Sequence, residues 1–250
     1  MTDPIADDRP EILQLADWRR QVADLYAEVR RLIRSDHEAA VELWRSKRER
    51  LFRDHAQSPV LLSKREAFRA HHYPIDPALR FEVLVEPDSP VASSSSGSAS
   101  AFGGFGAPID FGGANASPPS GGTMRAAPLA SDLPVSAGGT MAMRRIGRVE
   151  IPFPAGVRSL VVFWMSGYAG GLFIPFRDAT NGTETYGAGR YLIDGAKSAD
   201  LGGDPVRGTV ILDFNFAYHP SCAFDPKWAC PLAPPDSRLD IPVRAGERLT

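Results

Sequence analysis

The residues best suited to do chemistry lie in apolar, strand-like sequence in the second half of the chain. Residues 209–218 alternate in polarity, so Asp213 and Asn215 share one side of an expected strand. Arg190 opens another apolar run, and the guanidinium of a buried arginine matches a carboxylate or phosphate group. We therefore expect a pocket that takes a small polar or anionic ligand. Its expected lining is Arg190, Asp213, Asn215, Tyr218, Tyr186, Tyr191 and Asp178.

The same polar residues also have a purely structural interpretation. In that interpretation, Arg190 and Asp213 form an internal ion pair that ties two strands together. The chain is then a structural or interaction protein without a small-molecule site. Both interpretations stay open at this point, because a single sequence does not show whether Arg190, Asp213 and Asn215 face one cavity or pack against each other.

A second group of reactive residues lies in the loop at residues 219–231, which contains His219, Cys222 and Cys230. An imidazole and two thiolates suit zinc or copper, but the spacing matches no standard zinc finger and a complete fourth ligand is not evident. The separation of the two cysteines allows them to meet as a reversible disulfide. A catalytic Cys222 activated by His219 is a third interpretation, and two buried thiols packed as small apolar groups are a fourth.

This loop supplies the alternative function, a hydrolase-type enzyme that uses a metal or a thiolate. The usual catalytic templates are missing from the sequence. There is no phosphate-binding GKS or GKT loop, no G-x-S-x-G nucleophile elbow, and no glycine fingerprint between a strand and a helix. The pair His71-His72 precedes Tyr-Pro, where we expect an exposed turn. The cofactor, if there is one, stays unknown.

Composition limits the partners. The chain has 28 Lys and Arg against 30 Asp and Glu, so it lacks the strong positive field that nucleic acid or an anionic membrane favours. Its apolar runs are far shorter than the roughly 20 residues of a membrane helix. The first ten residues, MTDPIADDRP, have no apolar core and do not resemble a secretory signal. We therefore predict a cytoplasmic protein that binds neither nucleic acid nor membrane.

The elements that must position these residues are helices first and strands later. Residues 11–33 and 35–54 carry apolar side chains at three- and four-residue spacing, which predicts a helical hairpin that covers the rest or forms a homodimer. Residues 80–86 alternate like a first strand, and six more short apolar runs follow residue 141 between Gly, Pro, Asn and Asp. The expected class is α+β and mainly β, an antiparallel sandwich or partly closed barrel fronted by the helical hairpin.

Residues 89–140 differ from their surroundings. Of these 52 residues, 37 are Ser, Gly, Ala or Pro and three are charged, so they bury too little to offset the entropy of ordering. We expect a disordered, low-complexity insertion there. The expected organisation is a helical segment at 1–79, a first strand of the β domain at 80–88, the insertion at 89–140 and an antiparallel β domain at 141–250.

Two stretches resemble the bacterial domain of unknown function 1684 family. The first is residues 50–86, with Ser58-Pro59 and Tyr73-Pro74. The second contains TYGAGRYL at 185–192 and DFNFAY at 213–218, followed by Cys222, Cys230-Pro231 and Ala245-Gly246-Glu247. The resemblance covers about residues 40–249 apart from the insertion. It implies no activity, cofactor or catalytic residue, because the family is uncharacterised. His219 stands where the family pattern has Asn, which weakens a metal site that needs this imidazole.

Overall fold

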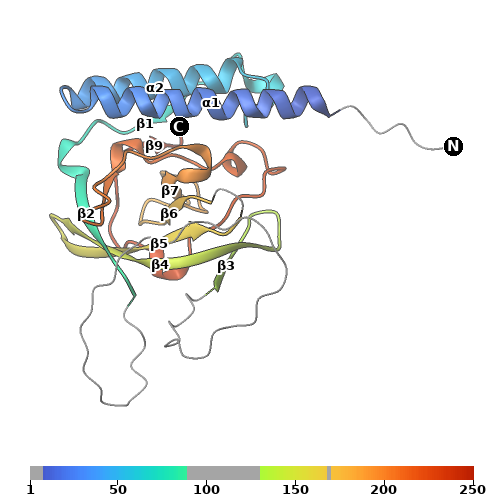
Figure 1. Cartoon of the computed structure of the whole chain (residues 1–250). Coiled ribbons are helices and arrows are strands. Elements are labelled where there is room, and N and C mark those ends of the chain that lie inside the picture. The colour runs from blue at the N-terminus through green and yellow to red at the C-terminus, as the bar shows by residue number, and fades with distance from the viewer. Residues whose placement is uncertain (1–7, 89–129, 168–169) are drawn as a thin grey trace, which may run out of the picture.

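The computed structural model describes residues 8–88, 130–167 and 170–250. Two N-terminal helices are followed by a mainly antiparallel sheet that curls into a half-barrel (Figure 1). The expected α+β class, a partly closed barrel fronted by a helical hairpin, is confirmed. The expected disorder at residues 89–129 lies outside the described residues. Residues 130–140, which we expected in the same insertion, form a strand, a turn and the start of the next strand.

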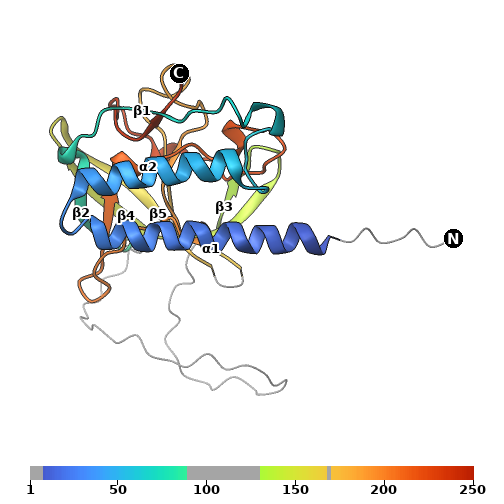
Figure 2. The same cartoon turned by 90° about the horizontal axis from the view of Figure 1, so that it is seen from above.

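The helices are α1 (Arg9–Leu32) and α2 (His37–Asp54), and they lie side by side across one side of the half-barrel (Figures 1 and 2). Asp36 caps the second helix, since its carboxylate accepts the N–H of Ala39 at 2.9 Å. None of the described helices is long and apolar enough to cross a membrane. The buried helical side chains are Leu25, Tyr26, Val29, Ala40, Val41, Trp44 and Phe52.

The half-barrel is a sheet with strand order β7-β6-β5-β4-β2-β8, and β3 pairs with β4 beside this path. Every pairing in it is antiparallel, which fits the turn-rich sequence between the strands. The strands are β2 (Arg80–Glu86), β3 (Ala130–Pro134), β4 (Thr140–Phe153), β5 (Gly156–Met165), β6 (Leu172–Phe176), β7 (Arg190–Asp194) and β8 (Thr209–Asp213).

A second, two-stranded sheet joins distant parts of the chain. Strand β1 (His71–His72) pairs with β9 (Glu247–Arg248). The histidine pair therefore lies in a strand and not in the exposed turn that we expected. The short 3₁₀ helices between the strands are η1 (Leu62–Lys64), η2 (Pro77–Leu79), η3 (Gly195–Lys197), η4 (Phe214–Phe216), η5 (Ser221–Ala223) and η6 (Pro235–Ser237).

Two expected strands differ from the structure. The strand expected at 209–218 stops at Asp213, because the Asp213 carboxylate accepts the backbone N–H of Asn215 at 3.0 Å and turns the chain into η4. Residues 239–243 form no strand. Their backbone instead meets the segment after β6, where Leu239 N–H donates to the carbonyl of Arg177 at 2.8 Å.

The apolar core has two parts. One fills the half-barrel, with Ile151, Leu212 and Phe214 among its buried residues. The other lies between the half-barrel and the helical hairpin, where the Trp44 ring meets the edge of Phe216 with ring centres 5.4 Å apart. The second part fixes the helices on the sheet, and the polar groups described below lie around it.

Candidate functional site

Arg190 is completely buried at the start of β7. Its guanidinium donates to the Asp178 carboxylate at 2.5 Å and to the carbonyls of Val243 and Ala245 at 2.7 and 2.5 Å, and a fourth hydrogen bond reaches the Glu247 carbonyl at 3.1 Å. Only its Nε atom lacks a partner among the described residues. Arg190 therefore binds a carboxylate and three carbonyls of this chain, and holds residues 243–247 against the sheet.

Asp213 and Asn215 do not meet Arg190. The Asp213 carboxylate lies 2.7 Å from Nε2 of His37 on α2, and it accepts the side-chain amide of Asn215 at 2.8 Å. The same amide group bridges the backbone of Asp76, accepting its N–H and donating to its carbonyl at 2.8 Å each. The expected pairing of Arg190 with Asp213 is therefore replaced by two separate connections, to Asp178 and to His37.

Of the three tyrosines expected in the pocket lining, Tyr191 and Tyr218 pack against each other, and Tyr186 packs against the ring of His219 instead. The Tyr191 and Tyr218 rings meet edge to face, with centres 5.9 Å apart, and their hydroxyls donate to the Pro231 carbonyl at 2.5 Å and to the Asp194 carboxylate at 3.2 Å. Burial raises the pKa of both phenols well above its ordinary value, so they stay neutral donors. Tyr186 donates its backbone N–H to Nε2 of His219 at 3.3 Å.

A buried ion pair between the helices and β9 was not predicted from the sequence. Glu247 accepts Nε of Arg48 at 2.6 Å and the backbone N–H of His219 at 2.7 Å. The Arg48 guanidinium also lies over the Phe52 and Tyr218 rings, at 4.2 and 4.5 Å from their centres. Burial opposes ionisation of Glu247, but the charge of Arg48 and its hydrogen bond outweigh it and hold the pKa of the carboxyl below its ordinary value.

Two histidines beside this ion pair are held neutral. Burial lowers the pKa of His219 and of His72 from an ordinary value near 6.5 to about 4. Since Nε2 of His219 accepts the N–H of Tyr186, the proton of the neutral ring is assigned to Nδ1. The ring is therefore occupied by structural contacts, and no hydrogen bond joins it to Cys222 or Cys230 among the described residues.

The two cysteines do meet. The backbone N–H of Cys222 donates to Sγ of Cys230 at 3.3 Å, and both are buried free thiols. A hydrogen bond from the Cys230 thiol lowers the pKa of Cys222 to about 6, and the same bond raises the pKa of Cys230. Within the described ranges, no group of three or more His, Cys, Asp or Glu side chains is arranged to hold a metal ion.

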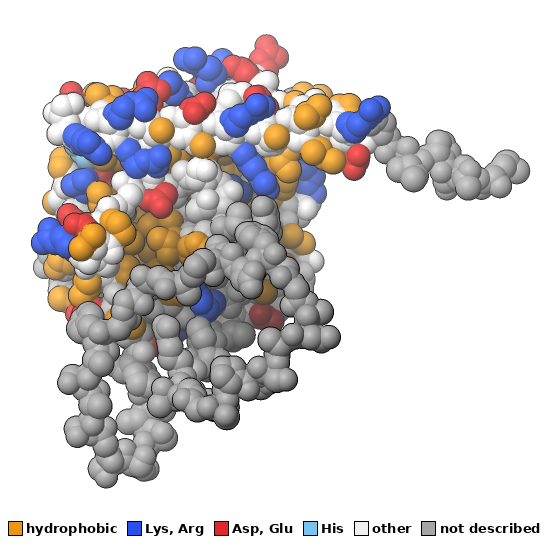
Figure 3. All heavy atoms as spheres, viewed as in Figure 1, with side chains coloured by type: hydrophobic (Ala, Val, Ile, Leu, Met, Phe, Trp, Pro, Cys, Tyr) orange, Lys and Arg blue, Asp and Glu red, His pale blue; other side chains and the backbone are white. Residues whose placement is uncertain are grey.

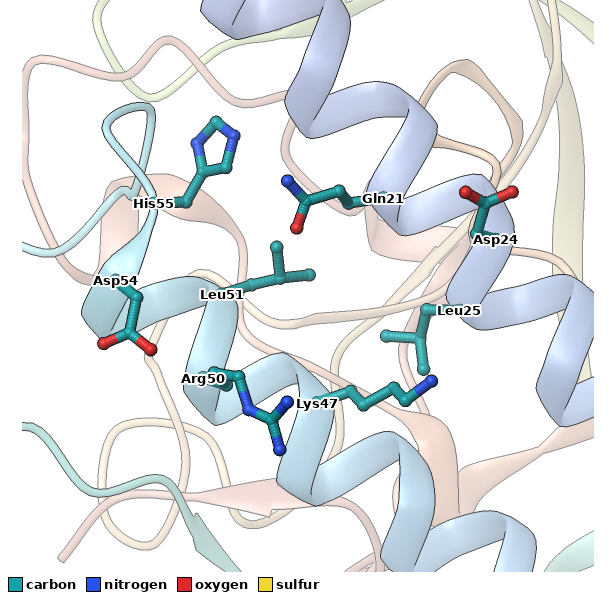
Figure 4. A pocket seen from close by; sticks show the side chains of 8 residues that line it. All are labelled: Gln21, Asp24, Leu25, Lys47, Arg50, Leu51, Asp54 and His55. Carbon is teal, nitrogen blue, oxygen red and sulfur yellow. The ribbon is translucent and has the colours of Figure 1, made fainter.

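Two cavities border α2. The first, of about 410 Å³, lies between α1 and α2 with Leu25 and Leu51 in its wall (Figure 4). The second, of about 560 Å³, lies on the other flank of α2, beside Ala70 and His72. In Figure 2, α2 runs between α1 and β1, consistent with one cavity on each flank. The lining of the second cavity is Glu42, Arg45, Ser46, Glu49, Arg50, Arg53, Asp54, Ala70 and His72.

The second cavity holds unpartnered polar groups. Nε of Arg45 and Nε2 of His72 are buried and have no hydrogen-bond partner among the described residues. In the same part of the structure, no carboxylate pairs with Arg50, which borders both cavities. Figure 3 shows Lys and Arg side chains distributed along the helical layer, with Asp and Glu between them. Among the described residues, Arg50 on α2 is thus a cation without a paired carboxylate, whereas the sequence led us to expect the ligand-binding cation at Arg190.

Fold and site together define a β-dominant α+β protein in which a buried arginine holds the late segment of the chain in place. The chain belongs to the family described as protein of unknown function (DUF1684), whose model matches residues 122–248. The expected family is thus confirmed. The matched range includes Asp178, Arg190, the two cysteines and Glu247, but neither helix.

A solved structure extends this similarity to the helices. The solution NMR structure of an uncharacterised protein of Haloarcula marismortui is 27% identical, with a TM-score of 0.52. The alignment covers 86% of this chain and 95% of that one, more than residues 89–250 alone contribute, so it includes part of the N-terminal region. No curated protein matches the chain.

Proposed function

We propose that this protein binds a small polar, anionic ligand in the cavity between α2 and residues 70–72. The observation that carries the proposal is the pair of buried nitrogen atoms, on Arg45 and His72, that have no partner among the described residues, next to the exposed Arg50. A buried donor without an acceptor costs about 1–3 kcal/mol, which a ligand oxygen at that position recovers. The cavity volume of about 560 Å³ lies within the usual range of small-molecule sites.

The charges in the cavity indicate the ligand class. Glu42 pairs with Arg45 at 3.1 Å, and Glu49 pairs with Arg53 at 3.7 Å, so these four charges offset one another. Arg50 is left as a free cation for a carboxylate or phosphate group. Asp54 has no ion-pair partner among the described residues and favours a hydrogen-bond donor on the same ligand. The ligand we propose therefore combines one anionic group with an amine or hydroxyl group.

The sequence suggested Arg190 as the ligand-binding cation, but the structure makes it a weaker candidate for this role. Its hydrogen bonds go to Asp178 and to carbonyls of residues 243–247, so an incoming anion would have to displace the groups that hold this segment. Within the described part of the chain, the hydrolase alternative lacks a hydrogen bond between His219 and Cys222. The cytoplasmic location stays a prediction, as does the homodimer through the N-terminal helices.

Thermal-shift screening with amino acids, hydroxy acids and sugar phosphates, followed by titration calorimetry of the hits, tests the proposal. The variant Ser46→Trp fills the cavity from an exposed position on α2, and Arg50→Gln removes the free cation. We expect each variant to weaken binding at least about tenfold. For Arg50→Gln, this factor corresponds to the loss of one charge-assisted hydrogen bond.

Matched controls separate the two cavities. Gln21→Trp fills the cavity between α1 and α2, and Arg19→Gln removes an exposed arginine of α1 that lines neither cavity. Both controls are expected to bind as the wild type does. A hit whose affinity is unchanged in both Ser46→Trp and Arg50→Gln refutes the proposed site, and a panel without any hit refutes the proposed ligand class.

A further inference from the structure

We propose that Cys222 and Cys230 are a reversible redox pair, which a small hydroperoxide converts from two thiols into an intrachain disulfide. The proposal concerns the loop between η4 and η6 and is independent of the cavities beside α2. It starts from the contact between the two residues, and from the composition of the chain, which contains no other cysteine.

The contact brings the two side chains together without a change of the fold. The N–H of Cys222 lies 3.3 Å from Sγ of Cys230, so the sulfur of Cys230 lies against Cys222. A disulfide forms when the two Cα atoms are within about 7 Å and the side chains face each other. Cys222 lies in η5, and only eight positions separate it from Cys230, so the short segment between them allows the two sulfurs to be brought to bonding distance.

Both ends of the pair are anchored. Cys230 donates its backbone N–H to Oγ of Ser136 at 3.0 Å, and its carbonyl accepts the N–H of Ser136 at 2.9 Å, which ties it to the turn between β3 and β4. On the other side, Phe224 follows Cys222 by two residues and meets the edge of Phe52 on α2, with ring centres 5.2 Å apart. The sulfur pair therefore joins a segment that contacts the helices to a segment held by the sheet.

The two thiols have different roles. Cys222 is assigned as the nucleophile, because the Tyr186 hydroxyl lies beside it, 3.5 Å from its carbonyl oxygen, and the Cys230 thiol is the neighbouring donor. These donors stabilise the thiolate and lower the pKa of Cys222 to about 6, below neutral pH. Cys230 keeps its proton and is the resolving thiol.

The reaction has two balanced steps. The Cys222 thiolate attacks one oxygen of the hydroperoxide, the oxygen–oxygen bond breaks, and the departing alkoxide takes a proton and leaves as an alcohol, or as water from hydrogen peroxide. Cys222 is then a sulfenic acid. The Cys230 sulfur attacks the Cys222 sulfur, the sulfur–oxygen bond breaks, and hydroxide leaves with the Cys230 proton as water. Two thiols have lost two electrons, and the peroxide has gained them.

A small oxidant fits the surroundings better than a bulky one. Both cysteines are buried, with 6% and 4% of their surface exposed. A hydroperoxide reaches such a sulfur more easily than a peptide-sized disulfide does. Reduction of the product requires a dithiol reductant and a local opening of the loop at residues 222–230.

The test is oxidation of the reduced full-length chain with hydrogen peroxide, followed by non-reducing peptide mass spectrometry. We expect an intrachain Cys222–Cys230 disulfide, restored to two thiols by dithiothreitol. The initial rate of Cys222 oxidation should rise with pH to a plateau with a midpoint near 6, instead of near 8.5 as for an ordinary cysteine.

Three variants make the test specific. Cys230→Ala should stop at the sulfenic acid and raise the midpoint, because the hydrogen-bond donor is lost, whereas Cys230→Ser keeps a donor and should retain a low midpoint. Cys222→Ser should leave Cys230 largely unoxidised. A wild-type product that is an intermolecular dimer or a sulfinic acid overturns the proposal. A midpoint near 8.5, or equal reactivity of Cys230 in Cys222→Ser, also overturns it.

Discussion

Lowering the pH should destabilise this protein at pH values well above those at which carboxylates titrate, because His219 and His72 are held neutral in the folded state. In the folded state the pKa of each is about 4, against about 6.5 in the unfolded chain. Between these values the unfolded chain binds more protons than the folded one, so stability is lost as the pH falls from 6.5 towards 4. For one such histidine, the loss between pH 8 and pH 5 is about 2 kcal/mol.

Urea unfolding at pH 8 and pH 5 measures this loss. For the wild type we expect the free energy of unfolding to fall by up to about 4 kcal/mol, if the two histidines contribute independently. Between pH 8 and pH 5, Glu247 contributes little to the change in the free energy of unfolding. Its carboxyl is ionised in the folded state, where its pKa is lowered, and it is mostly ionised in the unfolded chain as well. Comparing variants with the wild type removes the contributions of all other groups.

The variants identify the histidines. His219→Asn should reduce the difference between the two pH values by about 2 kcal/mol, and His72→Asn should do the same. The matched control is His71→Asn, which changes the exposed neighbour of His72 in the same strand and should leave the difference at its wild-type value. If His219→Asn and His72→Asn both keep the full wild-type difference, the burial argument for the histidines is refuted.

Three further outcomes are expected. Asp178→Asn leaves the buried Arg190 without its counter-charge and should lower the free energy of unfolding by about 3–5 kcal/mol in urea titrations. A loss under about 1 kcal/mol contradicts the argument that Arg190, paired with Asp178, holds residues 243–247 against the sheet. In the same assay, Trp44→Ala should lower the free energy of unfolding by about 3–5 kcal/mol. The control Leu13→Ala changes a side chain on α1 that is 68% exposed, and it should lower the free energy of unfolding by less than about 0.5 kcal/mol. If the exposed apolar residues of α1 form the predicted homodimer, light scattering should give a dimer for the wild type and a monomer for Leu13→Glu, whereas an unchanged mass for Leu13→Glu contradicts that interface.

The fold could be predicted from sequence where periodicity decides it. Apolar spacing located both helices, and short apolar or alternating runs located the strands of the half-barrel other than β3, because side-chain direction follows directly from these backbone geometries. Strand β3 was missed, since it lies in residues that we assigned to the low-complexity insertion. The end of β8 was missed, since the Asp213 side chain caps the following turn and local polar bonding overrides an alternating pattern. The strand predicted at 239–243 does not form, because Arg190 and the backbone after β6 bind the carbonyl and N–H groups of this segment.

The ligand cavity beside α2 was not predicted from the sequence, which pointed to Arg190 and its neighbours instead. Arg190, Asp213 and Asn215 are buried, but Arg190 pairs with Asp178 twelve positions away and Asp213 with a helix. These pairings depend on strand order, which places β2 between β4 and β8 and cannot be read from one sequence. Arg48 and Glu247 were missed because each resembles an ordinary exposed charge in its own segment, and only the fold brings them together.

The ion pair of Arg48 and Glu247 spans 199 positions, and β1 pairs with β9 across a similar distance. At ribosomal speeds of about 5–20 residues per second, roughly 10–40 s separate the synthesis of the two partners. Trp44 packs against Phe216, so this residue and its apolar neighbours on α2 have no completed sheet to cover until η4 has been made. The apolar face of the helical hairpin is therefore exposed on the nascent chain for most of that interval, and a chaperone would protect it there.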